Sequence, residues 1–138
     1  MGAETVEKAK KLVGDVVVGN LATVEDGQPR VRPIAMKWVG ERELWFATDG
    51  GSRKVSQLES NPAAEVCFND GQWNHVRLSG RASMTQDDAD RTRLWELIPE
   101  LGHHFSGPTD PKYTLVKIAV GRIEYMGTGM TEYAVHEF

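Results

Sequence analysis

The alternation of apolar and polar residues along the chain predicts a mainly β protein. The clearest run spans residues 75–84, in which every second residue is apolar or small: Val76, Leu78, Gly80, Ala82 and Met84. Five further strands are predicted over residues 16–24, 28–39, 43–48, 64–68 and 114–125. Six strands joined by hairpins favour a closed or nearly closed antiparallel barrel, because closure leaves few exposed strand edges.

Two local signals refine this barrel. Asp26-Gly27 is a typical two-residue hairpin turn between the strands over residues 16–24 and 28–39. In the last strand the apolar positions change phase at Gly121, which predicts a β-bulge there.

Short helices are predicted to interrupt the strands. The first covers residues 5–13 and ends at Gly14, and the last begins at Thr85, with Asp88 completing a capping-box pattern, and stops at Pro99. The middle helix begins at Ser52 and ends near residues 61–62. Its sequence differs from that of the last helix, whose first turn is acidic as the helix dipole favours.

The start of the middle helix is a candidate phosphate site. Arg53 and Lys54 lie in its first turn, where the helix dipole is already positive, so they cost stability unless an anion binds there. The preceding Asp49-Gly50-Gly51-Ser52 lets the backbone approach a ligand closely and leaves N–H groups free at the helix start. A solvated helix start with two surface cations is the alternative.

Length and charge limit the possible functions. At 138 residues the chain fits one domain, residues 1–138. The net charge of −4 argues against a nucleic-acid partner, so an anion site must be local. Cys67 is the only cysteine, which excludes an internal disulfide and favours a cytoplasmic location. We expect neither a signal peptide nor a membrane span, because the first residues are polar and no apolar run is long enough.

These motifs together resemble the pyridoxamine 5′-phosphate oxidase-like family of FMN-binding split barrels, in particular its small general-stress proteins. The resemblance rests on residues 32–37 (RPIAMK), 44–48 (LWFAT), 51–54 (GSRK) and 61–62 (NP), in identity and in spacing. It implies a six-stranded antiparallel split barrel with short helices that binds FMN.

The resemblance also implies the contacts of the cofactor. The strand over residues 32–37 would line the flavin, residues 47–48 would lie against it, and the helix start would hold its phosphate. The candidate cofactor-binding residues are therefore Arg32, Pro33, Ile34, Lys37, Ala47, Thr48, Ser52, Arg53 and Lys54. Strict alternation would put Arg32 and Lys37 on opposite faces, unless Pro33 bends the strand.

His75 completes the candidate cofactor site. It stands where the oxidases of the family carry a flavin-contacting glutamine, and an imidazole could donate the same hydrogen bond. An exposed histidine at a strand end is the alternative. The adjacent His103 and His104 lack partners at ligand spacing, so we expect no metal site and assign them to a loop or an interface.

The function that the resemblance implies is flavin-dependent oxidoreduction with a small-molecule electron donor or acceptor. The flavin itself carries out the chemistry, so no catalytic side chain is assigned. The resemblance further implies a homodimer with flavin at the subunit interface. A flavin-binding stress protein without turnover, and a deazaflavin- or haem-binding split barrel, are the alternatives.

The oxidase of the vitamin pathway is not the expected activity. In the oxidases a tyrosine, an arginine and a serine on the helix after the central strand bind the substrate phosphate. At the corresponding spacing this chain has Arg93, Leu97 and Leu101, and two leucines offer a phosphate no hydrogen bond. The oxidases also carry an Arg-x-His-Asp-Arg signature, whereas residues 130–138 contain two acids and no arginine.

Overall fold

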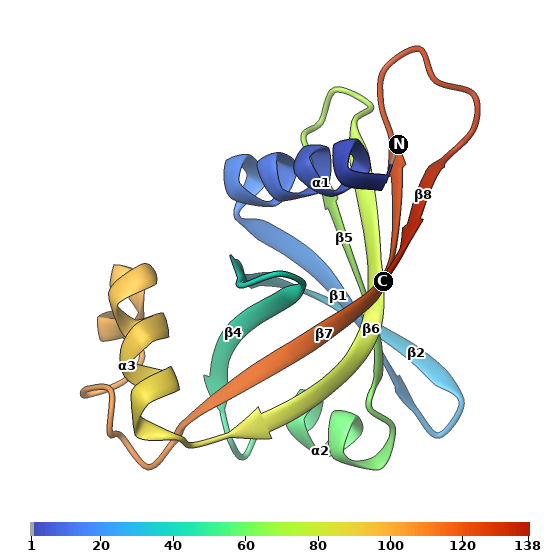
Figure 1. Cartoon of the computed structure of the whole chain (residues 1–138). Helices are drawn as coiled ribbons and strands as arrows, with labels where there is room; N and C mark the ends of the chain where they lie inside the picture. The colour runs from blue at the N-terminus through green and yellow to red at the C-terminus, as the bar shows by residue number, and fades with distance from the viewer. Residues whose placement is uncertain (1) are drawn as a thin grey trace.

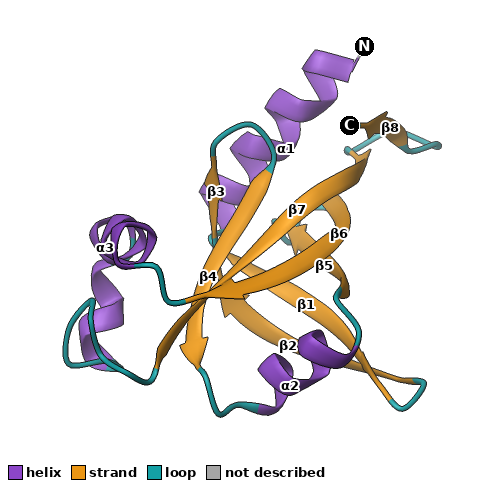
Figure 2. Cartoon of the chain, turned by 60° about the horizontal axis from the view of Figure 1, so that its bottom comes forward, coloured by secondary structure: helices purple, strands orange, loops and turns teal. Residues whose placement is uncertain are grey.

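The computed structural model describes residues 2–138 as an antiparallel sheet that curls into a split barrel (Figures 1 and 2). The strands are β1 (Val18–Glu25), β2 (Gln28–Ala35), β3 (Lys37–Val39), β4 (Glu43–Asp49), β5 (Ala63–Asn69), β6 (His75–Thr85), β7 (Tyr113–Met126) and β8 (Ala134–Glu137). They pair in the order β2-β1-β5-β6-β7-β4-β3, with β8 added to β7. Apolar side chains of these strands face a common interior, as the alternation predicted.

The two ends of this path meet at a single residue. β2 and β3 are consecutive in sequence and are separated only by Met36, which is buried and whose N–H donates to the Val17 carbonyl over 3.0 Å. The sheet therefore closes through the covalent connection from β2 to β3 at Met36, and not through hydrogen bonds between these two edge strands. This arrangement explains why residues 28–39 form two strands and not the single strand that we predicted.

The main core fills the barrel and extends under the first helix. Helix α1 (Gly2–Val16) buries Ala9, Leu12 and Val13 against the strands and lies across one end of the barrel (Figure 1). Helix α2 (Arg53–Ser60) lies at the opposite end and buries Val55 and Leu58. Each fully buried aliphatic side chain contributes about 1.5–3 kcal/mol relative to exposure.

The bulge predicted at Gly121 is confirmed. Ser79 pairs with Arg122 while Gly80 pairs with Val120, so Gly121 is the extra residue of β7. The neighbouring Gly80 has a structural role of its own, because a Cβ there would lie 2.0 Å from the Ala119 carbonyl oxygen. The phase change keeps Ile123 buried beyond the bulge.

A second, smaller core covers the outer face of β4 and β7. Helix α3 (Asp88–Leu97) and the 3₁₀ helix η1 (Pro99–His103) bury Leu94 and Leu101 against Trp45 and Leu115. β4 therefore has two buried faces. This outlying layer supplies one wall of a cleft.

Several predicted boundaries need correction. Residues 2–138 form eight strands rather than six, because residues 28–39 divide at Met36 and because β8 carries no sequence signal that we recognised. α1 continues through Gly14 to Val16 and ends where Val17 adopts a positive φ of 72°.

The start of α3 also differs from the prediction. The N-cap is Asp87, whose carboxylate accepts from the Asp90 N–H over 3.0 Å, whereas Thr85 is the last residue of β6. The first strand begins at Val18 rather than at residue 16, because α1 runs through Val16. The predicted ends of the middle helix and the hairpin turn are confirmed: α2 runs from an N-cap at Ser52 to a C-cap at Asn61, and the turn residues Asp26 and Gly27 have φ values of 50° and 78°.

Candidate functional site

The loop between β4 and α2 is tightly fixed. The Asp49 carboxylate accepts from the Gly51 N–H over 2.8 Å, and the Gly50 N–H donates to the Lys112 carbonyl over 2.9 Å. Gly50 is required there, since a Cβ would lie 2.6 Å from Thr114 Oγ1. The loop thus holds the start of α2 against β7.

The start of α2 has no side-chain cap. Ser52 is the N-cap residue, but its hydroxyl forms a hydrogen bond of 3.3 Å with Thr48 Oγ1 and does not cap the helix. The first turn contains no acidic residue. Both features leave the positive end of the helix dipole without a counter-charge from the helix itself.

Four cations surround a hollow of about 340 Å³ beside this helix start. They come from the edge strand β2 and from the first turn of α2, and Val31 and Gln57 complete the lining; the cations are Arg30, Arg32, Arg53 and Lys54. We call this space the cationic hollow. Arg30 has an ion pair with Glu25 at 3.2 Å, whereas the other three have no ion pair within 4.0 Å among residues 2–138.

The cations repel one another in the ligand-free chain. Partial burial, followed by repulsion from Arg53 and Arg30, lowers the pKa of Arg32. Burial and repulsion from Arg32 lower the pKa of Lys54. An anion placed among these groups would relieve the repulsion, so the electrostatics of the hollow suit a phosphate.

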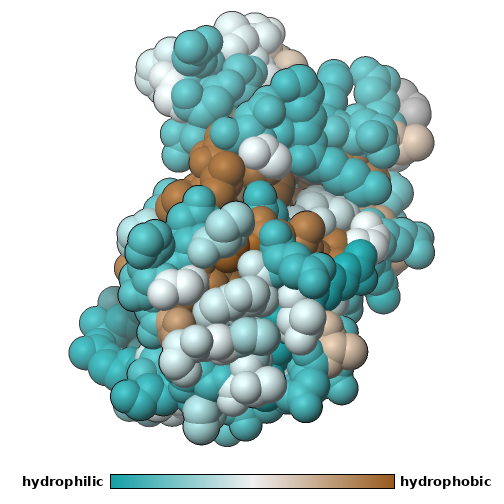
Figure 3. Space-filling model, turned by 90° about the vertical axis from the view of Figure 1, so that its left-hand side faces the viewer, coloured by the Kyte–Doolittle hydropathy of each residue, from teal (hydrophilic) through white to brown (hydrophobic). Residues whose placement is uncertain are grey.

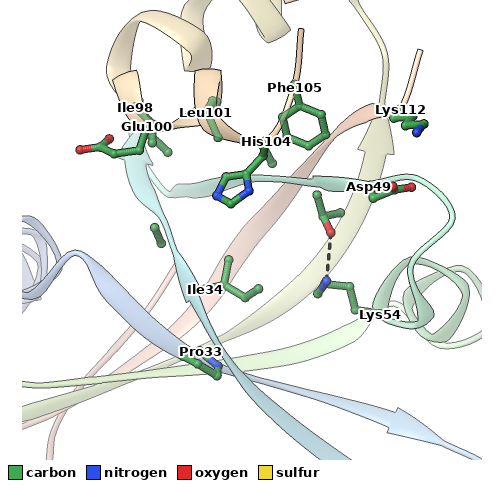
Figure 4. A pocket seen from close by; sticks show the side chains of 13 residues that line it. Pro33, Ile34, Asp49, Lys54, Ile98, Glu100, Leu101, His104, Phe105 and Lys112 are labelled. Atoms are coloured by element: carbon green, nitrogen blue, oxygen red, sulfur yellow. Dashed lines mark hydrogen bonds between the residues drawn. The ribbon is translucent and has the colours of Figure 1, made fainter. Parts of the chain in front are cut away.

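A cleft of about 600 Å³ adjoins the hollow, and Lys54 lines both. One wall is β2 and β4, and the other is the segment from the end of α3 to β7 (Figure 4). The lining residues are Pro33, Ile34, Ala35, Ala47, Thr48, Asp49, Lys54, Ile98, Glu100, Leu101, His104, Phe105 and Lys112. Figure 3 shows the side of the molecule on which apolar side chains gather in a recess between hydrophilic surfaces.

Lys54 and Thr48 connect the two spaces. The Lys54 ammonium donates to Thr48 Oγ1 over 3.0 Å, at the point where β4 leads into the α2 loop (Figure 4). Thr48 is buried, so its hydroxyl keeps the ammonium at the junction of cleft and hollow. A ligand with a flat body and an anionic end could occupy both spaces.

Most of the predicted cofactor residues converge here. Pro33, Ile34, Ala47, Thr48 and Lys54 line the cleft, Arg32 and Arg53 line the hollow, and Ser52 stands at the N-cap position of the helix beside them. These residues converge because the sheet curls and so brings β2 close to β4, although the two strands do not pair with each other.

Lys37 and His75 lie outside both spaces in the described chain. β2 ends at Ala35 and the chain turns at Met36, so Lys37 begins β3, opposite Trp45, and is half-buried. His75 begins β6, with β1 and β5 between it and β2, and its Nε2 forms a hydrogen bond of 2.8 Å with the Tyr133 hydroxyl. These two assignments stay predictions.

The sequence did not indicate the far wall of the cleft. His104 points into the space between η1 and β2, toward Ile34 (Figure 4). From the sequence we had assigned His103 and His104 to a loop or an interface. Phe105 is held beside it by stacking on Tyr113, with ring centres 5.1 Å apart. Among the described residues no group of three or more potential ligands forms a metal site.

Comparison with known proteins identifies the family of the chain. The family model of pyridoxamine 5′-phosphate oxidase matches residues 5–127, which contain the whole hollow and cleft. The chain belongs to this family. The chain is similar to a pyridoxine/pyridoxamine 5′-phosphate oxidase of Cupriavidus taiwanensis, with 39% identity over 71 residues, and to one of Rubrobacter xylanophilus, with 34% identity over 64 residues.

The match to these oxidases is partial. It covers 50% and 46% of this chain but only 34% and 30% of the two relatives. The chain therefore spans about a third of the length of the curated relatives it matches.

Solved structures match over nearly the whole chain and establish the split-barrel fold. General Stress Protein 26 from Bacillus anthracis has a TM-score of 0.78 at 23% identity, covering 94% of this chain and 98% of its own. A NimC/NimA family protein from Clostridium acetobutylicum has a TM-score of 0.85 at 20% identity, covering 99% and 94%. A pyridoxamine 5′-phosphate oxidase-related, FMN binding protein from Nostoc punctiforme has a TM-score of 0.73 at 18% identity, covering 96% and 86%.

One further property follows from the helices. Within residues 2–138 none of them is both long and apolar enough to cross a membrane.

Proposed function

We propose that this chain binds FMN and works as a flavin-dependent oxidoreductase related to, but distinct from, the vitamin-pathway oxidase. The observation that carries the proposal is the cationic hollow. Arg32, Arg53 and Lys54 converge beside an uncapped helix start with no carboxylate paired to them among residues 2–138, in a chain whose net charge is negative.

The charge of the hollow matches a phosphomonoester. A phosphate group carries about −1.5 to −2 charges near neutral pH and offers three acceptor oxygens. Three cations with N–H donors, together with the N–H groups at the start of α2, can satisfy those oxygens. Arg30 adds little, because it is already paired with Glu25.

The adjoining cleft suits the rest of FMN. Its volume of about 600 Å³ lies in the usual range for small-molecule sites, about 300–1,000 Å³. Apolar side chains from both walls, such as Ile34 and Phe105, can contact a flat ring, and Lys54 links the ring region to the phosphate region.

In this proposal the residues of the chain bind and orient FMN, and the cofactor itself carries out the chemistry. When bound, FMN supplies hydride or electron transfer. Arg32, Ser52, Arg53 and Lys54 would hold its phosphate, while Pro33, Ile34, Ala47 and Thr48 would contact its body. The far wall would shield one side of the site from water through Leu101 and Phe105.

The proposal includes a homodimer, and an exposed sheet face supports it. Val31, Pro33 and Ala35 alternate along the outer face of β2, and Val18 lies opposite Ala35 on β1. Val31 is 65% exposed and Val18 is 45% exposed, which is unusual for a contiguous apolar face of a monomer. A second copy covering this face would bury it.

The same dimer would account for His75. Its side chain belongs to the outer face of β6, on the sheet surface that continues through β5 and β1 to Pro33. Pro33 and Ala35 line the cleft as well as this surface. A copy packed here could therefore bring His75 of the partner subunit to the flavin, although His75 lies away from the cleft of its own chain.

Spectroscopy of the purified protein tests the cofactor directly. We expect the absorption spectrum of bound flavin, and release of FMN on denaturation as identified by mass spectrometry. Bound haem or a deazaflavin would contradict the proposal. Reduction of the bound flavin by NADH or NADPH at steady state would distinguish an oxidoreductase from a flavin-binding stress protein without turnover.

A further inference from the structure

Gln57 forms a buried polar network with Arg32 of the cationic hollow. It lies one turn along α2 from Arg53 and is only 4% exposed. Its Oε1 accepts from Arg32 Nη2 over 2.8 Å and from Thr23 Oγ1 over 2.6 Å. Arg32 Nη1 in turn donates to Thr23 Oγ1 over 2.8 Å and to the Leu21 carbonyl over 3.2 Å.

These bonds join α2 to the hairpin of β1 and β2. Arg32 belongs to the edge strand β2, Thr23 to β1 and Gln57 to α2. An arginine side chain has four flexible torsions and would otherwise sample many positions at a sheet edge. The network therefore fixes the guanidinium beside Arg53 and Lys54, which line the same hollow.

The acceptors are all neutral, and this is the informative feature. An amide oxygen, a hydroxyl and a carbonyl orient the guanidinium without neutralising it. A carboxylate at position 57 would orient it equally well but would cancel its charge. Among residues 2–138, the carboxylate that contacts the network is that of Glu25, which accepts from the amide nitrogen of Gln57 over 3.4 Å and pairs with Arg30.

We propose that Gln57 is a positioning residue that makes the site selective for a phosphorylated ligand, by holding Arg32 in place while leaving its charge available. This inference rests on the proposed function. Gln57 itself contacts Arg32 and Thr23, and it acts on the ligand only through Arg32.

A merely structural role for Gln57 makes a different prediction. If the amide only attached α2 to β1, its loss would lower stability and would weaken FMN and riboflavin equally. If it positions Arg32, its loss would weaken FMN much more than riboflavin, which lacks the phosphate. The ratio of the two dissociation constants therefore separates the two roles.

The experiment measures this ratio in Gln57→Leu, which keeps the volume and removes the acceptor. Thr23→Val removes a second acceptor of Arg32 and serves if Gln57→Leu does not fold. We expect either variant to reduce the preference for FMN over riboflavin by about tenfold, with riboflavin affinity little changed. Ser60→Ala, an exposed change at the end of the same helix, is the control and should leave the preference intact.

The same measurement in a protein that already carries Arg32→Gln completes the test. In Arg32→Gln the preference should already be reduced, and adding Gln57→Leu should cause no further loss. The inference would be overturned if folded Gln57→Leu and Thr23→Val kept the wild-type preference for FMN over riboflavin. It would also be overturned if Gln57→Leu reduced this preference equally with Arg32 present and with Arg32 replaced. Either result would leave the proposed function standing. A wild-type protein with no preference for FMN would overturn both.

Discussion

Lys54 donates a hydrogen bond to Thr48 across 3.0 Å, and this contact joins the end of β4 to the first turn of α2. The two residues belong to different elements, and each was a candidate cofactor residue from sequence. Their contact places an ammonium at the junction between an apolar cleft and a cationic hollow. A ligand bound across that junction would meet the cations of the hollow at one end and apolar side chains such as Ile34 and Phe105 at the other.

The first prediction concerns pH. Burial and Arg32 lower the pKa of Lys54, so the folded ligand-free chain binds this proton less tightly than the unfolded chain does. The contribution of Lys54 to stability therefore rises as pH increases from the lowered pKa toward the ordinary lysine value. Phosphate binding has the opposite sign, because it needs the charged ammonium.

We therefore expect FMN affinity to decline as the pH rises, and the decline should begin at a lower pH than it would if Lys54 had the ordinary lysine pKa. Titrations between about pH 7 and pH 10 can follow the decline. Lys54→Arg keeps a charge throughout this range and should remove the decline. Identical profiles for wild type and variant would show that another group is responsible.

The second prediction concerns Gly50, at the close approach of the loop to β7. Gly50→Ala places a Cβ 2.6 Å from Thr114 Oγ1, so the loop or the buried Thr114 must move. We expect a loss of about 1–3 kcal/mol in the free energy of unfolding and weaker FMN binding. Gly14→Ala is the matched control, since Gly14 is helical and an added Cβ would meet nothing within 4 Å. This substitution should raise the free energy of unfolding by about 0.5–1 kcal/mol. Chemical denaturation measures both, and equal effects would refute the steric argument.

These cases show what the sequence could and could not predict. The strands, α2 and the bulge at Gly121 were predictable because each depends on residues close together in the chain. The motif around Arg53 was predictable for the same reason, since helix dipoles and glycine loops are local. β8 was not predictable, because four residues with little alternation form a strand only when β7 is there to pair with them.

The missed site residues share a different cause. Gln57 is a polar residue on a short helix, and its role depends on Thr23 and Arg32, which are 34 and 25 residues away in sequence. His104 gave no helical or strand signal, and its place opposite β2 follows from the packing of α3 and η1 on β4. Long-range packing of this kind leaves no local pattern in a single sequence.

The third prediction is that the FMN-loaded protein does not turn over pyridoxamine or pyridoxine 5′-phosphate. Of the three positions at the spacing of the oxidase phosphate contacts, Leu101 is buried, and Arg93 lies over the Trp45 ring with its guanidinium carbon 5.6 Å from the ring centre. Leu97 is partly exposed but cannot bond a phosphate. An oxygen-consumption assay should show no saturable oxidation of either compound, and clear saturable turnover would restore the vitamin-pathway activity.

The fourth prediction concerns the exposed β2 face. Val18→Asp adds a charge to the same surface on β1, at a residue that does not line the cationic hollow as Val31 does, so we expect the dimer to dissociate and the flavin to bind less tightly. Val135→Asp, at an exposed position of β8, is the control and should leave the dimer unchanged. Size-exclusion chromatography with light scattering gives the oligomeric state. A wild-type monomer that holds FMN stoichiometrically would contradict the dimer.

The central claim is that the phosphate of FMN binds between β2 and the start of α2, and titration of FMN and riboflavin into Arg53→Ala/Lys54→Ala tests it most directly. Each charge-assisted contact contributes about 1.5–3 kcal/mol, so the loss of two should weaken FMN by a hundredfold or more. Riboflavin should bind the variant almost as it binds wild type. Lys8→Ala/Lys11→Ala removes two exposed lysines of α1 and should change neither affinity. An FMN affinity of the double variant equal to that of wild type would contradict the account.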